Sequence, residues 1–153
     1  MNGRVDIGEL VPHAGTMCLL EELVDWDAGG ATVITRSHQA PGNPLRRGGR
    51  LSAICLCEYG AQAMAVHGAL IARASGKALA PGLLVSLRDV QLFAANVDTL
   101  PGELRVQVQR LDAGAGGLQY RFRVSHDDEV VALGRVAVIE SRAAARAVGP
   151  PPA

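Results

Sequence analysis

The sequence has few aromatic residues and no excess charge of either sign. Phe, Trp and Tyr together make up 3% of the 153 residues, so the core must be built from Val, Leu, Ile, Ala and Met. Fifteen basic and 15 acidic residues give a formal net charge of zero, and no basic stripe stands out. This balance argues against nucleic acid as the main partner. It also favours self-association over a highly soluble monomer.

Cysteine is scarce too, with Cys18, Cys55 and Cys57 as its three occurrences. They form no C-x-x-C pair and have no His at zinc spacing, so we expect reduced, buried thiols and no metal. The N-terminal MNGRVDIGELVPH lacks the apolar segment of a signal peptide, and a cytoplasmic location is expected.

A long apolar stretch, Leu51–Ala72, contains a single formal charge, Glu58. The stretch is almost long enough to span a membrane, but the polar residues within it favour a core helix of a soluble domain. Burying an ionised carboxylate is costly unless it is hydrogen-bonded. Glu58 is therefore either a structural acid bonded to its surroundings or a chemical group at the edge of a cleft.

Helical spacing places Glu58 and Gln62 one turn apart on the same face, in a stripe of small residues. Gln62 either orients the carboxyl group or packs as an ordinary amide between helices. His67 falls nearly half a rotation away from Glu58, so we expect it in the core or in an interface. His126, in a polar turn with Asp127 and Asp128, is expected at the surface.

The rest of the chain predicts mainly strands. Met17–Asp27 and the β-branched run 31–37 are expected to form a hairpin, and residues 38–50, rich in Pro and Gly, a loop. Ser52 is a candidate N-cap of the central helix, and a single helical turn is expected at Ile7–Leu10.

Four further strands are expected after the helix, forming a meander: Leu83–Phe93, Glu103–Leu111, Leu118–Ser125 and Glu129–Glu140. A helix that is apolar on nearly every face must be enclosed, and a curved antiparallel sheet of about six strands can enclose it. We therefore predict an α+β fold with this sheet wrapped around one long helix. Residues 1–142 should form a single domain, followed by a flexible tail at 143–153.

Two motifs resemble those of the hotdog-fold 3-hydroxyacyl-carrier-protein dehydratases. The segment LVPHAGTMCLLEELVDWD is similar to their L-P-H opening, and CLCEYGAQAMA is similar to their acid-x-x-x-Q-A helix signature. The E-Y-x-A-Q-A form resembles most closely the subgroup associated with aryl-polyene and related lipid pathways. The resemblance extends to about Glu140 and implies a hotdog fold.

In that family the helix acid works with a His from the preceding loop, commonly across a dimer interface. The loop here, SHQAPGNP, keeps a His and the Pro-Gly pair but lacks the family's Phe and is one residue longer. The resemblance therefore implies Glu58 as the acid and His38 as the base. His13, beside Pro12 in the N-terminal motif, is the other candidate base. The alternative for His38 is a solvated loop residue. The alternative for His13 is a residue that holds the backbone of a turn.

Dehydration of a 3-hydroxyacyl thioester needs a base for the α-proton, an acid for the departing hydroxyl, and donors for the enolate-like oxygen. Gln62, Asn43 and Arg47 are the predicted substrate-binding residues. Arg46, Arg47 and Arg50 would suit an acidic carrier protein or a phosphopantetheine phosphate, although an ordinary solvated loop has the same composition.

We thus expect a dehydratase acting on thioesters of acyl carrier protein or CoA, with no cofactor of its own because the substrate carries the phosphopantetheine. A homodimer or higher homo-oligomer is expected, because one such sheet leaves an edge unpaired. The alternatives are a thioesterase of the same fold and a non-catalytic subunit that binds acyl thioesters.

Overall fold

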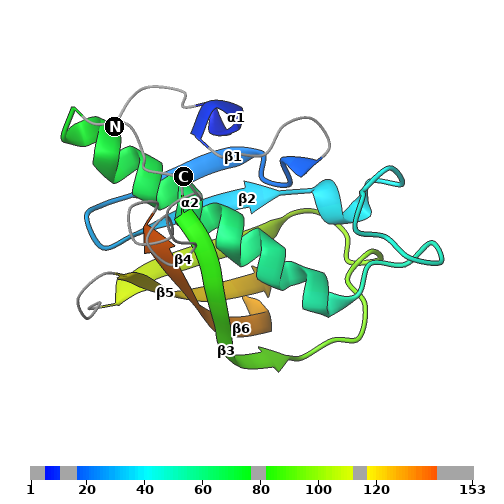
Figure 1. Ribbon diagram of the computed structural model, residues 1–153. Helices are drawn as coiled ribbons and strands as arrows, with labels where there is room; N and C mark the ends of the chain where they lie inside the picture. Colours follow the sequence, from blue (N-terminus) through cyan, green and yellow to red (C-terminus); the bar gives the residue numbers. More distant parts are fainter. Residues whose placement is uncertain (1–5, 11–16, 77–81, 112–116, 141–153) are drawn as a thin grey trace, which may run out of the picture.

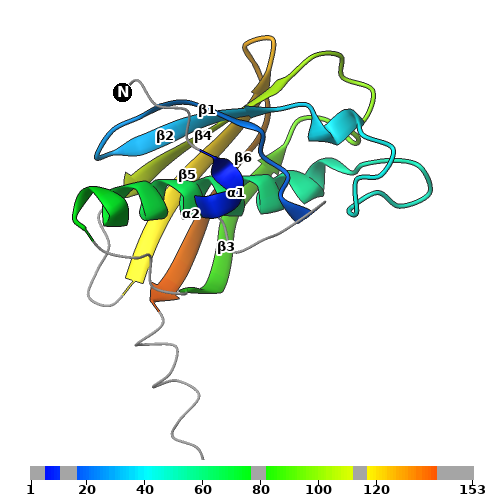
Figure 2. The same ribbon diagram turned by 90° about the horizontal axis from the view of Figure 1, so that it is seen from above.

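A long helix enclosed by a curved antiparallel sheet forms the centre of the protein in the computed structural model, which describes residues 6–10, 17–76, 82–111 and 117–140. Helix α2 (Leu56–Ala74) crosses one face of the six-stranded sheet (Figure 1). The short helix α1 (Ile7–Leu10) packs against α2 (Figure 2). The strands are β1 (Glu22–Trp26), β2 (Gly30–Thr35), β3 (Gly82–Leu92), β4 (Leu104–Leu111), β5 (Gly117–His126) and β6 (Glu129–Glu140). The predicted α+β class, with a curved sheet around one helix, is confirmed.

The strand order is β1-β2-β4-β5-β6-β3, so the predicted four-strand meander is wrong for its first strand. β3 pairs with β6 at the far edge, and β4 pairs with β2 in the middle of the sheet. The chain between β3 and β4 passes the start of the helix, where Val97 N–H donates to Leu51 O at 2.9 Å. The alternation of apolar and polar residues within a strand indicates which face of the sheet is covered, but not which strand lies beside it. The sequence therefore could not exclude a sheet in which these four strands are neighbours in chain order.

The helix begins later than expected because residues 53–55 wind as a 3-10 turn before α2. The Ser52 side chain accepts a hydrogen bond from Ile54 N–H at 3.4 Å, so the predicted cap lies at the start of this turn. Figure 1 shows the expected loop between β2 and this turn; it contains a further 3-10 turn at Ser37–Gln39.

The helix approaches the sheet closely at Phe122 of β5. A Cβ atom on Gly60 of α2 would lie 2.5 Å from Phe122 Cγ, and one on Gly134 of β6 would lie 2.6 Å from the edge of the same ring. Phe122 is fully buried. Two glycines therefore create the space in which one of the few aromatic rings joins helix and sheet.

By length and composition alone, residues 53–74 could cross a membrane. However, 61% of the apolar window is buried inside the protein, as in the core helix of a folded domain. The predicted core helix is thus confirmed. The expected domain boundary at residue 142 and the tail at 143–153 lie outside the described residues.

Candidate active site

Glu58 lies in the first turn of α2 and is half-buried. Gln62, one turn further on, donates from Nε2 to Glu58 Oε1 at 3.3 Å. The helical spacing therefore predicted this contact correctly. It places an amide donor directly on the single carboxylate of the apolar helix.

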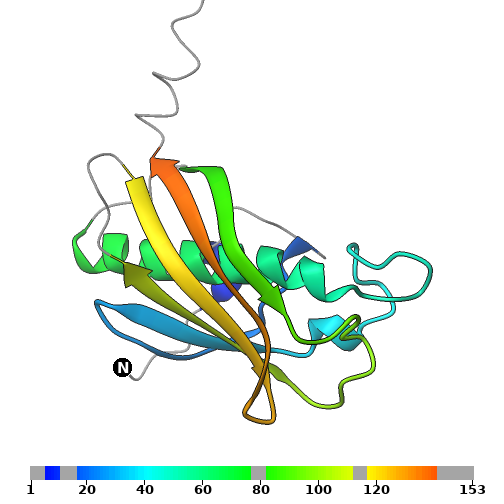
Figure 3. The same ribbon diagram turned by 90° about the horizontal axis from the view of Figure 1, so that it is seen from below.

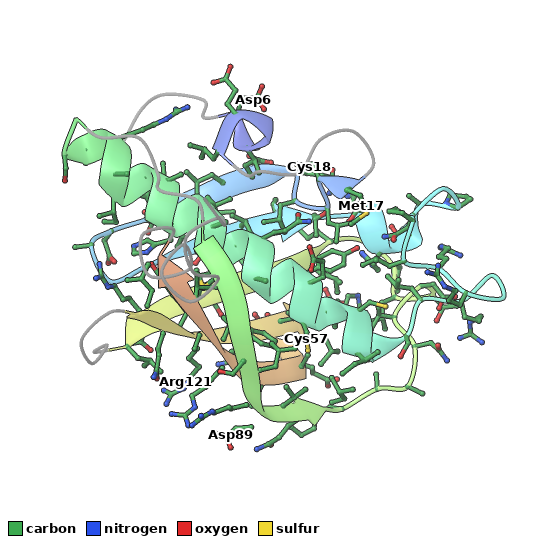
Figure 4. The ribbon with its side chains drawn as sticks, viewed as in Figure 1. Asp6, Met17, Cys18, Cys57, Asp89 and Arg121 are labelled. Carbon is green, nitrogen blue, oxygen red and sulfur yellow. The ribbon has the colours of Figure 1, made fainter. Side chains whose placement is uncertain are left out.

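Gln62 also ties the segment before β1 to the helix. Its Nε2 donates to Met17 O at 2.6 Å, and its Oε1 accepts from Leu19 N–H at 2.9 Å. Gln62 is only 1% exposed, so these bonds replace the water that a buried amide would otherwise need. Figure 4 labels Met17 and its neighbour Cys18. Both roles considered for Gln62, orientation of the carboxyl and packing, are thus combined in one side chain.

The same segment is held from the other side by the end of β2. Leu19 O accepts from Thr35 Oγ1 at 2.5 Å and from Ser37 Oγ at 2.7 Å. Glu21 accepts from Arg36 N–H at 2.5 Å. Residues 17–21 are therefore fixed between the sheet and the helix face that carries Glu58.

Tyr59 organises the loop that follows β2. Its hydroxyl lies 2.8 Å from Ser37 Oγ and 3.0 Å from Asn43 Nδ2, and burial raises its pKa. Asn43 also donates to Ser37 O and accepts from Leu45 N–H, both at 2.9 Å. The Asn43 amide thus holds the loop in place, and its role in binding substrate stays a prediction.

His38 is fully buried in this loop. Its Nε2 lies 2.9 Å from Leu100 O, and since a carbonyl only accepts, Nε2 carries the proton. Burial lowers the pKa of His38, which favours the neutral ring. Nδ1 is buried and has no hydrogen-bond partner among the described residues. His38 therefore has a free lone pair, but this nitrogen faces the protein interior.

His13, the other candidate base, lies outside the described residues, so its role stays a prediction. The predicted arginine cluster is mostly bonded within its own loop. Arg46 donates to Gly49 O and Gln39 O, each at 2.9 Å, and Arg50 lies 3.0 Å from Asp98. Arg47 is exposed and donates to Pro44 O at 3.0 Å.

The remaining histidines have structural partners. His67 is fully buried, with Nε2 2.8 Å from Asp27 O and Nδ1 2.6 Å from Tyr120 Oη, which confirms its predicted place in the core. His126 was expected at the surface, but its side chain is only 14% exposed and lies 2.7 Å from Pro101 O. Asp127 and Asp128 in the polar turn are exposed, whereas the His126 ring contacts the loop that contains Pro101.

The three cysteines are free thiols, with Cys57 buried and Cys18 and Cys55 half-buried. Within the described ranges, no group of three or more His, Cys, Asp or Glu side chains could hold a metal ion.

Solved structures share this architecture. The dehydratase heterocomplex ApeI:P from Xenorhabdus doucetiae contains a chain that matches with a TM-score of 0.83 at 18% identity, over 95% of this chain and 99% of that one. A putative esterase from Mycobacterium tuberculosis matches at 0.58 and 14% identity, over 78% and 89%. A mutant thioesterase from Staphylococcus aureus matches at 0.55 and 12% identity, over 77% and 90%. At such identities these likenesses show the fold, which is the predicted hotdog fold.

The family model of the ApeP-like proteins, described as ApeP dehydratase, matches residues 5–148. The chain belongs to this family, and the predicted dehydratase class is confirmed. No curated protein sequence matches the chain significantly.

Proposed function

We propose that the protein removes water from 3-hydroxyacyl thioesters to give trans-2-enoyl thioesters, with Glu58 as the acid. One observation carries this assignment within the dehydratase family. The single carboxylate of the apolar helix lies half-buried, and the Gln62 amide that contacts it also holds the adjacent N-terminal segment. A carboxyl group held in a fixed place is what proton transfer to a leaving group requires.

In the proposed reaction a base removes the proton α to the thioester carbonyl, and the electron pair forms the new carbon–carbon double bond. The C3–O bond breaks, and Glu58 gives its proton to the departing hydroxyl, which leaves as water. The proton taken by the base then returns to Glu58 through solvent. Backbone N–H groups at the start of the helix would stabilise the enolate-like oxygen.

His13 is the base we favour over His38. The described hydrogen bonds fix Met17 on the helix face of Glu58, and His13 precedes Met17 by four residues, a span of at most about 14 Å. The lone pair of His38, by contrast, is on a buried nitrogen inside the loop. A base must touch the substrate, so its basic nitrogen has to be reachable.

We further propose that two copies associate along β3. This strand is an edge of the sheet, and exposed Leu87, Leu92 and Phe93 lie on it or directly after it. Ile54, at the start of the helix, is 51% exposed, and its neighbour Ala53 donates to Ala95 O in the chain that follows β3. An unpaired edge beside exposed apolar side chains favours association with another sheet. The Xenorhabdus doucetiae neighbour is itself described as a heterocomplex, so a related hotdog chain is the alternative partner.

Purified protein incubated with a 3-hydroxyacyl thioester, linked in turn to acyl carrier protein and to CoA, tests the proposed activity. We expect the 2-enoyl product, detected by its conjugated absorbance and by a mass loss of one water. Two structural neighbours are described as an esterase and a thioesterase, so hydrolysis is the second candidate. Release of free thiol without enoyl product would favour hydrolysis. Tight binding of the thioester without either product would favour a non-catalytic subunit.

A further inference from the structure

The outer face of the sheet, opposite α2, carries arginines in register on three neighbouring strands. Arg121 of β5 pairs with Arg135 of β6, which pairs with Arg88 of β3. Arg123 follows on the same face of β5, because Phe122 between them points into the core. Figure 3 views this face directly, and no described helix crosses it. Like charges directly opposite one another in a sheet are destabilising, so this arrangement calls for a physical explanation.

Few carboxylates in the described residues neutralise this row. Arg135 lies 2.9 Å from Asp89, and Figure 4 shows Asp89 and Arg121 on the same side of the sheet, away from α2. Arg88, Arg121 and Arg123 form no ion pair with any described residue. In a chain of zero net charge, positive charge is thus concentrated on one face.

Two hollows lie along the row. One, of about 590 Å³, is lined by Arg121 and Arg123 together with Gln107 and Gln109 of β4. The other, of about 240 Å³, is lined by Arg88 and Arg135. Both hollows are open to solvent, and cationic and amide donors border them.

We propose that this arginine face binds the acidic surface of another protein. Arg121 and Arg123 are two residues apart on one strand, about 7 Å, and carboxylates one turn apart on a helix are about 6 Å apart. Guanidinium groups pair with carboxylates through two parallel hydrogen bonds, and arginine is enriched in protein interfaces.

Other occupants fit less well. Asp25 and Asp27 line the far end of the larger hollow and would repel a uniform polyanion such as nucleic acid. A second copy of this chain, placed face to face, would set arginine against arginine. A protein surface with carboxylates at its centre and a basic residue at its rim is complementary to this face. The carboxylates would meet the arginines, and the basic residue would meet Asp25 and Asp27. The proposal does not depend on the dehydratase activity.

The test uses a helical peptide with Glu one turn apart on one face, and a matched peptide with Gln in place of Glu. Trp26 is the single tryptophan and lines the larger hollow, so its fluorescence reports occupancy. We expect a saturable change with the Glu peptide, weakened by added salt, and little change with the Gln peptide. The double substitution Arg121→Gln and Arg123→Gln should weaken binding on the order of tenfold or more.

The control is the double substitution Arg36→Gln and Arg73→Gln, which removes the same charge from exposed arginines on other parts of the surface. It should leave the affinity within about twofold of wild type, since pairs beyond a Debye length are screened. Circular dichroism establishes that both variants are folded. Three results would each overturn the proposal. The first is an equal loss of affinity in both variants, and the second is equal binding of the two peptides. The third is tighter binding of duplex DNA or anionic vesicles than of the Glu peptide.

Discussion

At the scale of single residues, the sequence predicted the pairing of Glu58 with Gln62 but not what else Gln62 does. The pairing follows from helical periodicity, which relates residues four positions apart. The bonds from Gln62 to Met17 and Leu19 join residues 45 and 43 positions apart, and no local pattern contains them. The burial of His38 was missed for the same reason, because its partner Leu100 is 62 residues away.

The two candidate bases should respond differently to substitution. His13→Gln is expected to lower kcat by about 10²- to 10⁴-fold, the usual contribution of a general base. His38→Ala should instead lower the free energy of unfolding by about 1–3 kcal/mol, because Leu100 O loses its side-chain donor. Urea unfolding and turnover of both variants measure this. If the His38→Ala variant lost activity while keeping full stability, and His13→Gln stayed active, the base would be His38.

At the scale of helices and strands, periodicity predicted the core helix and the presence of six strands, but not their neighbours. β6 was predicted with its observed bounds, and β3, β4 and β5 within one residue at each end. The first expected strand was too long, because Met17 and Leu19 are held by side chains rather than by a strand ladder. The place of β3 depends on where the chain passes the helix, which alternation within a strand does not encode.

The contact of α2 with β5 should not tolerate a methyl group at Gly60. Alanine favours a helix by up to about 1 kcal/mol over glycine, but its Cβ would meet the Phe122 ring. We expect overpacking to dominate and Gly60→Ala to destabilise the protein by about 1–3 kcal/mol in urea unfolding. Gly42→Ala is the matched control, since a Cβ there meets nothing within 4 Å and should change stability by less than about 0.5 kcal/mol. A Gly60→Ala variant more stable than wild type would show that the Phe122 ring moves to accommodate the methyl group.

At the scale of the whole molecule, one sheet serves three purposes on different surfaces. Its inner face buries the helix that carries Glu58, and its outer face carries the arginine row. Its β3 edge is available for a second chain. The fold could be predicted because two motifs and the order of elements agreed. The arginine row could not, because its members lie on separate strands and meet only through cross-strand register.

Association along β3 predicts a dimer in solution. Light scattering at micromolar concentration should give about twice the chain mass of 16.0 kDa. Leu92→Asp with Phe93→Asp should give the monomer mass, because charges on an edge prevent pairing. Val24→Asp, an exposed position on the opposite edge strand β1, should leave the dimer intact. A monomeric wild type, or equal dissociation by the control, would contradict this interface.

Turnover of a 3-hydroxyacyl thioester by Glu58→Gln tests the central claim most directly. Loss of the only carboxylate in the apolar helix should lower kcat by about 10²- to 10⁴-fold with the fold retained. Glu22→Gln, at an exposed position on β1, should retain wild-type turnover. Full activity of a folded Glu58→Gln variant would show that the acid lies elsewhere and that Glu58 has only a structural role.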